Sequence, residues 1–277
     1  MEAFPQNWCY TPGAPRVWGG VGGGPARERG DSVAATARDL SKLDDLVATY
    51  GERFLPLQLD VTDREADFAA VRQAHERFGR LDVVVNNAGY GHFGMVEEIS
   101  EPEARAQLET NLFGALWVTQ AALPFLREQG SGHILQVSSI GGISAFPLVG
   151  IYHASKWALE GLSQALSQEV APFGIKVTLI EPGGFATDWA GSSSSTSEPL
   201  PAYAEFHQQV QEQRRKRVGT PGDPNASAAA VMEIVDADEP PLRCFFGKAP
   251  LNIAKADYEG RLATWEKWQP VAELAQG

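Results

Sequence analysis

Short apolar runs alternate along the chain with longer stretches in which apolar residues recur every three or four positions. The short runs have the length and aliphatic content of buried strands, and they cover residues 32–37, 54–59, 81–85, 133–137, 175–180 and 242–246. The longer stretches predict helices over residues 41–50, 63–78, 101–128, 151–170, 202–218 and 223–236. Ser41 and Asp63 are expected to cap the first two helices, which end at Gly51 and Gly79.

This alternation of strand and helix predicts an α/β fold in which helices cover both faces of a doubly wound parallel sheet. We find no internal repeat and no domain-length linker, so residues 1–277 are expected to form a single domain. Residues 1–30 are atypical, and residues 188–218 are expected to form a substrate loop and lid. Within that region, the Gly- and Ser-rich residues 191–197 indicate a hinge or a disordered loop.

The composition is that of an ordinary globular protein, with 43% hydrophobic and 21% charged residues. A net charge of −12 argues against a nucleic-acid-binding face and against a polybasic membrane anchor. No apolar run reaches the ~18 residues of a membrane span, and the N-terminus lacks the features of a signal peptide. Two cysteines do not make a disulfide framework. We therefore expect a soluble, cytoplasmic protein.

Tyr152 and Lys156 are four residues apart on a predicted helix, so their side chains share one face. A free Tyr has a pKa of about 10, and a neighbouring ammonium lowers it. Such a pair suits general acid/base chemistry at an alcohol oxygen. Ser139 ends the preceding strand, at the edge of a parallel sheet where ligands bind, and its hydroxyl can hold the same oxygen. Asn111 is a polar residue in an otherwise apolar helix, which suggests a hydrogen-bonding role.

These residues and two further motifs resemble the short-chain dehydrogenase/reductase family. The motifs are Asn86-Asn87-Ala88-Gly89 after a strand and Pro182-Gly183 after another, and all five features occur in the family's order. The resemblance is strong from about residue 32 to 180 and weak to about 260. It implies a Rossmann fold and hydride transfer between NADP(H) or NAD(H) and a carbonyl or secondary alcohol. It also implies a homodimer or homotetramer formed through the helices that carry Asn111 and Tyr152.

The resemblance assigns a role to each matching residue. Tyr152 is implied to be the acid/base, Ser139 to orient the substrate oxygen, and Asn111 to hold a water in the proton relay. Lys156 is implied to lower the pKa of Tyr152 and to bind the nicotinamide ribose. The positions implied to contact the cofactor are Asp60 and Val61 beside the adenine, Asn87, Ala88 and Gly89 after the strand, and Pro182, Gly183 and Thr187 at the nicotinamide edge.

The residue after the strand 32–37 bears on the choice of cofactor. An acidic residue there binds the ribose 2′-OH of NAD, whereas this chain has Arg38, whose guanidinium matches a 2′-phosphate. The sequence therefore favours NADP(H). Asp39 follows directly and leaves NAD(H) as the alternative.

The first glycine-rich turn departs from the family's pattern. Gly13 and Gly19 fall on its first and last glycine positions, but Val17 falls on the middle one, where a Cβ crowds a phosphate. The helix expected over residues 19–25 carries five glycines and a proline, which together cost roughly 8 kcal/mol relative to Ala. We expect that helix to be missing, displaced or poorly formed.

Two interpretations of this segment remain open. One is a frameshift before Ala26, because the out-of-frame reading permits Gly-Phe-Gly followed by an Ala- and Glu-rich helix. The other is a working phosphate loop whose backbone N–H groups form a nest. The altered loop also supports an alternative to the enzyme: a catalytically silent relative with weak cofactor binding that serves as a binding or regulatory subunit.

Aromatic residues around the expected site suit an apolar ketone or secondary alcohol. The candidate substrate contacts are His92, Phe93, Phe146 and Trp189. No spacing of Cys and His indicates a metal site.

Overall fold

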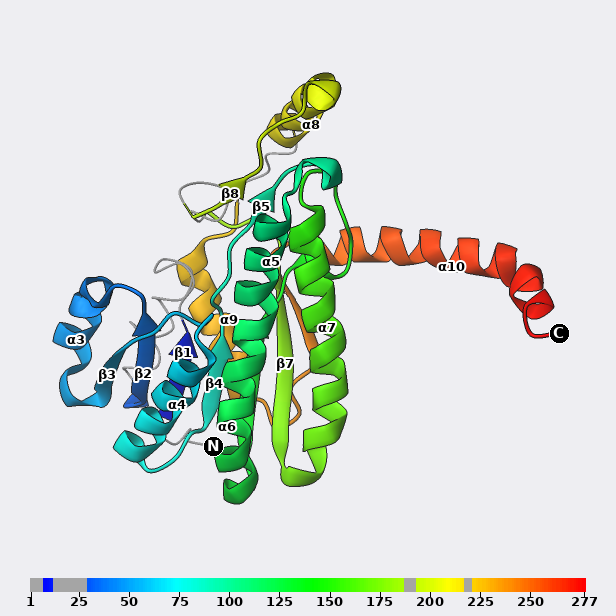
Figure 1. Ribbon diagram of the computed structural model, residues 1–277. Helices are drawn as coiled ribbons and strands as arrows, with labels where there is room; N and C mark the ends of the chain where they lie inside the picture. The colour runs from blue at the N-terminus through cyan, green and yellow to red at the C-terminus, as the bar shows by residue number, and fades with distance from the viewer. Residues whose placement is uncertain (1–6, 12–28, 187–192, 217–220) are drawn as a thin grey trace.

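The computed structural model describes residues 7–11, 29–186, 193–216 and 221–277. Its strands build a seven-stranded sheet in the order β3-β2-β1-β4-β6-β7-β9, with every neighbouring pair parallel (Figure 1). The strands of this sheet are β1 (Asn7–Thr11), β2 (Ser32–Ala37), β3 (Phe54–Gln58), β4 (Val83–Asn86), β6 (Gly132–Val137), β7 (Ile175–Pro182) and β9 (Arg243–Phe246). The predicted doubly wound sheet is confirmed.

Helices cover both faces of this sheet, as predicted. The helices of the described residues are α3 (Asp44–Tyr50), α4 (Arg64–Phe78), α5 (Glu101–Leu108), α6 (Ala115–Gln129), α7 (Gly150–Val170), α8 (Ala204–Lys216), α9 (Ser227–Asp236) and α10 (Pro250–Leu274). Of these, α8 lies beyond one end of the sheet and α10 extends away from it (Figure 1). Successive side chains of a strand point to opposite faces. In β4, Val83 and Val85 accordingly join the core under α3 and α9, whereas Val84 joins the core under α4, α6 and α7.

The sheet has its topological switch point between β1 and β4. From β1 the chain winds outward through β2 to β3, and from β4 it winds the other way through β6 and β7 to β9. The crevice above such a point is where open α/β sheets bind their ligands. β1 forms at the centre of the sheet although its sequence has few aliphatic residues, because strands on both sides hydrogen-bond it.

The helix caps follow the prediction in part. Asp63 caps α4 by accepting from the backbone N of Ala66 at 3.1 Å, and Gly79 ends it with φ +78°. The prediction of Ser41 as a cap is wrong. Asp39 is the cap, and its carboxylate accepts from the Ser41 N at 3.1 Å, so the chain first forms a 3₁₀ turn before α3 begins at residue 44.

The helix predicted over residues 101–128 is interrupted. Between α5 and α6 the chain forms a π-helical turn, Glu109–Gly114, which widens the helix by one residue. Gly114 ends this turn against Val61, because a Cβ on Gly114 would lie 2.7 Å from Val61 Cγ2. The turn therefore sits tightly against the segment that follows β3.

The expectation of a hinge or disordered loop at residues 191–197 is wrong for its described part. Ser195–Thr196 form β8, which pairs in parallel with β5 (His92–Phe93), and the next residue, Ser197, is buried. Residues 187–192, which include Thr187 and Trp189, lie outside the described part of the chain. The expectations for Gly13, Gly19 and the helix over residues 19–25 lie outside it too.

α10 is a helix that the sequence pattern did not predict. Arg261, near its middle, lies 4.6 Å from the ring centre of Trp157 on α7, and the helix extends away from the sheet (Figure 1). Its outer half exposes both Trp265 and Trp268. Among the residues that the structure describes, no helix is long and apolar enough to span a membrane.

Asp67 gives the fold a testable dependence on pH. Its side chain on α4 is fully buried, and neither carboxylate oxygen has a hydrogen-bond partner among the described residues. Burial, followed by the charges of Asp63 and Asp60, raises the pKa of Asp67 to about 8. The unfolded value is about 3.9, so between pH 4 and 8 the folded chain binds more protons than the unfolded chain. Its contribution to the free energy of unfolding must therefore fall as the pH rises through this range.

We expect Asp67→Asn to remove this dependence and to raise the free energy of unfolding at pH 9 by about 1–3 kcal/mol, with little change at pH 4. Urea unfolding of both proteins at the two pH values measures the difference. Glu65→Gln, an exposed carboxylate on the same helix, is the matched control. An equal effect of Asp67→Asn at both pH values would show that the carboxylate does not titrate as described.

Candidate active site

Two neighbouring elements bring Ser139, Tyr152 and Lys156 together. Ser139 follows β6, and α7 carries the other two residues one helical turn apart near its N-terminus. Tyr152 and Lys156 are both buried, each with about 5–6% of its surface exposed. The parallel strands β4, β6 and β7 all end at this edge of the sheet. The structure thus assembles the predicted catalytic residues at the edge where ligands bind.

Ser139 is held in place by its own loop. Its Oγ accepts from the backbone N of Gly141 at 3.0 Å and so caps the 3₁₀ turn Ile140–Gly142. The same hydroxyl hydrogen-bonds the side chain of Tyr152. Two hydroxyls, one aliphatic and one phenolic, therefore meet at one point and can share a substrate oxygen.

Burial decides the protonation of both residues on α7. It raises the pKa of Tyr152 to about 12, and the hydrogen bond from Ser139 offsets part of this rise. It lowers the pKa of Lys156 to about 8, and the charge of Glu160 opposes that shift. The expectation that Lys156 brings the pKa of Tyr152 below its ordinary value is wrong for this structure, because desolvation of the phenol dominates. Tyr152 is a neutral phenol at neutral pH.

Lys156 is fixed by a backbone contact. Its Nζ donates to the carbonyl O of Val137, at the end of β6, at 2.8 Å and lies 5.9 Å from the centre of the Tyr152 ring. A Cβ on Gly89 would lie 3.6 Å from this nitrogen and 3.1 Å from the Oδ1 of Asn111. Gly89 therefore lets the turn after β4 approach both side chains closely.

Asn111 ties this turn to α7. Its Nδ2 donates to the carbonyl of Tyr90 at 3.0 Å and to the Ser155 Oγ at 3.2 Å, and its Oδ1 accepts from the Tyr90 N at 3.1 Å. The Ser155 Oγ donates in turn to the carbonyl of Tyr152 at 2.6 Å. The buried polar residue that the sequence singled out is thus hydrogen-bonded on both sides, and its role toward a water stays a prediction.

The described positions implied to contact a cofactor lie at the carboxyl ends of parallel strands. Arg38 follows β2, Asp60 and Val61 follow β3, and Asn87, Ala88 and Gly89 follow β4. Pro182 ends β7, and Gly183 follows it. Arg38 and Asp60 are exposed, and Val61 is buried. Since these ends flank the switch point between β1 and β4, the described residues fit an extended dinucleotide along this edge.

The predicted substrate contacts in the described residues lie in different surroundings. His92 is buried, and its Nε2 lies 2.8 Å from the Ser197 Oγ, so its role as a substrate contact stays a prediction. Phe93 is half-buried in β5. Phe146 lies beside the catalytic helix, with its ring centre 5.5 Å from that of His153.

His153 is a site residue that the sequence analysis missed. Its Nδ1 lies 2.8 Å from the carbonyl of Gly141, and its Nε2 accepts from the backbone N of Phe146 at 2.9 Å. It therefore braces the loop between Ser139 and α7. Its position directly after Tyr152 is the signal that could have found it. Among the described residues, no group of three or more His, Cys, Asp or Glu side chains could hold a metal ion.

Comparisons with known proteins agree on one protein family. The family model described as short chain dehydrogenase matches residues 25–198. Oxidoreductase BOA17 of Botryotinia fuckeliana is 43% identical over 267 residues, which cover 96% of this chain and 97% of that protein. A solved short-chain dehydrogenase from Streptomyces avermitilis is 39% identical, with a TM-score of 0.87 over 98% of both chains. A solved alcohol dehydrogenase from Thermococcus sibiricus, complexed with 5-hydroxy-NADP, is 25% identical, with a TM-score of 0.69 over 86% of this chain and 95% of that one.

Proposed function

Because the chain belongs to the short-chain dehydrogenase/reductase family, we propose that it moves a hydride between a nicotinamide cofactor and an apolar ketone or secondary alcohol, with Tyr152 as general acid/base. The observation that carries this proposal is the hydrogen bond between Tyr152 and Ser139, one helical turn from Lys156 at the carboxyl edge of the sheet. When bound, the nicotinamide ring supplies the hydride for reduction or accepts it in oxidation.

The neutral phenol of Tyr152 can donate a proton when a ketone is reduced. In reduction, the carbonyl carbon gains the hydride, and the oxygen takes the phenolic proton of Tyr152 as its negative charge develops. Ser139 donates to the same oxygen and fixes its position. In oxidation the alcohol proton must move to the phenolate, which a pKa of about 12 makes scarce at neutral pH. At neutral pH the phenol of Tyr152 is therefore in the form that donates the proton of reduction.

Lys156 and Asn111 position these groups. The ammonium of Lys156 lies between the end of β6 and the turn after β4, where it would hold the hydroxyls of a bound ribose and place positive charge near the phenolate that forms. Asn111 holds Tyr90 and α7 at a fixed separation. Contacts in the described residues support both roles.

We further propose a preference for NADP(H). Arg38 is exposed directly after β2, and its guanidinium matches the geometry of a 2′-phosphate. Asp39, the residue that would favour NAD(H), accepts hydrogen bonds from the Ser41 N at 3.1 Å and from the Ser41 Oγ at 2.8 Å. These bonds hold the carboxylate at the start of the 3₁₀ turn and support Arg38 as the residue that selects the cofactor.

Arg38→Gln is expected to raise the Kd for NADPH by about 10–100-fold and the Kd for NADH by less than about twofold, because only NADPH loses a charge-assisted bond. Titration of each cofactor by its fluorescence measures both constants. Lys42→Gln, which removes an exposed cation in the following 3₁₀ turn, is the control. Equal weakening of both cofactors would remove Arg38 as the selecting residue.

The proposed function is tested with a panel of aliphatic and aromatic ketones, assayed with NADPH and NADH. We expect turnover of apolar ketones and saturable NADPH binding in the micromolar range. The alternative, a catalytically silent relative, predicts no binding up to millimolar cofactor. Binding without turnover of any panel member would leave the cofactor assignment standing and overturn the substrate class.

A further inference from the structure

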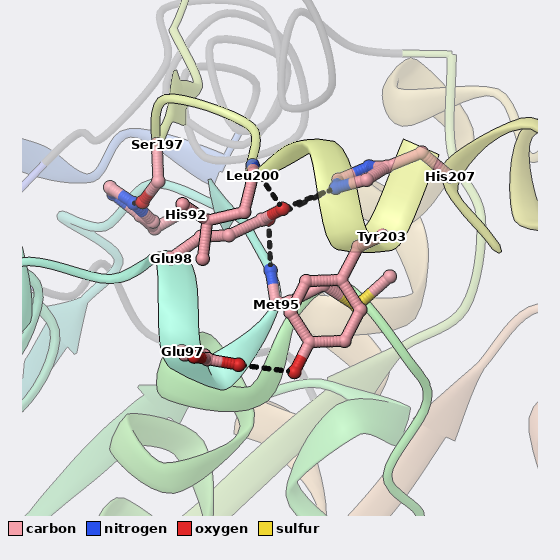
Figure 2. A network of polar contacts seen from close by, with 8 residues as sticks. All are labelled: His92, Met95, Glu97, Glu98, Ser197, Leu200, Tyr203 and His207. Carbon is pink, nitrogen blue, oxygen red and sulfur yellow. Dashed lines mark hydrogen bonds and ion pairs between the residues drawn. The ribbon is translucent and has the colours of Figure 1, made fainter. Parts of the chain in front are cut away.

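The carboxylate of Glu98 joins two segments that are far apart in the sequence, its own turn at residues 95–98 and residues 200–207 (Figure 2). Its Oε2 accepts from the backbone N of Met95 at 2.7 Å, and its Oε1 accepts from the backbone N of Leu200 at 2.9 Å. The Nε2 of His207 on α8 lies 2.7 Å from Oε1 and 3.0 Å from Oε2. No atom of this side chain is exposed to solvent.

A buried carboxylate is stable only when its hydrogen bonds are satisfied. Burial alone would raise the pKa of Glu98, but the bonds from His207, Met95 and Leu200 together lower it below its ordinary value. The charged form is therefore compatible with burial only while residues 200–207 stay in place against the turn that carries Glu98. Removing the carboxylate would release Leu200 and His207 together.

The segment that Glu98 holds lies against the loop leading to the active site. On α8, Val210 packs with Met95 and Leu148, and Tyr203 lies beside this cluster. Leu148 belongs to the loop that enters α7, four residues before Tyr152. Figure 1 shows α8, β5 and β8 beyond the same end of the sheet. The position of α8 thus sets one side of the region next to the catalytic phenol.

The beginning of the same segment is held by different contacts. β8 pairs with β5, and the Ser197 Oγ lies 2.8 Å from the His92 Nε2 and donates to Glu103 at 3.1 Å. None of these contacts uses Glu98. A change at Glu98 should therefore loosen α8 and the residues just before it, while β8 keeps its protection.

We propose that Glu98 is a positioning residue that seats α8 beside the substrate-binding region and so sets the affinity for the substrate. The part of this proposal that concerns substrate affinity rests on the proposed function, whereas the anchoring of α8 does not. The first part concerns KM for the ketone, because among the described residues the Glu98 carboxylate bonds to Met95, Leu200 and His207 and not to Tyr152 or Ser139.

The first test is amide hydrogen exchange of the full chain carrying Glu98→Gln or Glu98→Ala. We expect exchange of peptides covering residues 198–213 to quicken by at least about tenfold, with peptides covering 193–197 changed by less than twofold. Glu97→Gln is the matched control, because Glu97 is the adjacent carboxylate and, within the described part of the chain, its side chain accepts one exposed bond, from the Tyr203 hydroxyl at 2.6 Å. His207→Gln keeps Glu98 and removes only the contact from α8, so it serves if Glu98→Ala fails to fold.

The second test is steady-state kinetics with NADPH and methyl ketones of increasing chain length. We expect KM for the ketone to rise by at least about tenfold in Glu98→Gln, with kcat changed by less than about threefold and the Kd for NADPH unchanged. Unchanged exchange in residues 198–213 would overturn the anchoring. Faster exchange with unchanged KM, or an equal loss in kcat, would overturn the positioning role. Absence of turnover by the unmodified chain would overturn the proposed function and the part of this proposal that concerns substrate affinity, while exchange still decides the anchoring.

Discussion

Tyr152→Phe is expected to lower kcat for ketone reduction by about 10²–10⁴-fold, because it deletes the proton donor and keeps the ring. The Kd for NADPH should stay within about twofold, since the change removes one oxygen that binds Ser139 and leaves Lys156 in place. Steady-state kinetics and a fluorescence titration of NADPH measure the two quantities.

The pKa of Tyr152 adds a pH signature to this prediction. With the pKa raised to about 12, reduction by the unmodified chain should stay level from pH 6 to 9 as far as this group is concerned, whereas alcohol oxidation should quicken as the pH rises. Tyr258→Phe, on the exposed part of α10, is the control and should change neither rate. Turnover by Tyr152→Phe at the original rate would place the proton donor elsewhere.

Lys156→Met is expected to lower kcat/KM by at least about 10²-fold, through both weaker cofactor binding and slower chemistry. The change also leaves the carbonyl of Val137 without its donor, which costs about 1–3 kcal/mol of the free energy of unfolding. Kinetics and urea unfolding of the same preparation separate the two effects.

Lys176→Met is the matched control for this change. The Nζ of Lys176 donates to the carbonyl of Ala237 at 3.0 Å, a contact of the same kind near the start of β7, away from the catalytic edge. We expect a similar loss of stability and full activity. If Lys176→Met lowers kcat/KM as far as Lys156→Met does, the loss at Lys156 is one of folding and not of chemistry.

The parts of the site that sequence predicts are those carried by local spacing. Tyr152 and Lys156 meet because four residues make one turn of α7, and Ser139 is placed by the end of β6. The apolar runs likewise reveal every strand of the main sheet except β1, whose central position comes from its neighbours. Hydrophobic period and residue spacing can be read within a short stretch of sequence, so these features can be predicted without knowing the contacts between distant segments.

What the sequence could not predict depends on contacts between distant segments. Glu98 and His207 meet across 109 positions, and β8 is a strand of two residues that exists because β5 lies beside it. No pattern within either segment encodes such a pairing. α10 was missed for a different reason, since its apolar residues spread around the helix, and Gly260 and Pro270 lie within it.

The widened turn around Asn111 gives this helix a place where the chain can change in length. A residue lost from an ordinary helix rotates everything before it by about 100° about the helix axis. The π-helical turn Glu109–Gly114 holds one residue more than the α-helical winding it replaces, so a single deletion there would restore ordinary winding and leave both flanks in phase. Gln107, which donates to the carbonyl of Tyr90 at 3.1 Å, would keep its place. Loss of one residue is therefore better tolerated in this turn than elsewhere in the helix, and its effect falls on Asn111, which the turn carries.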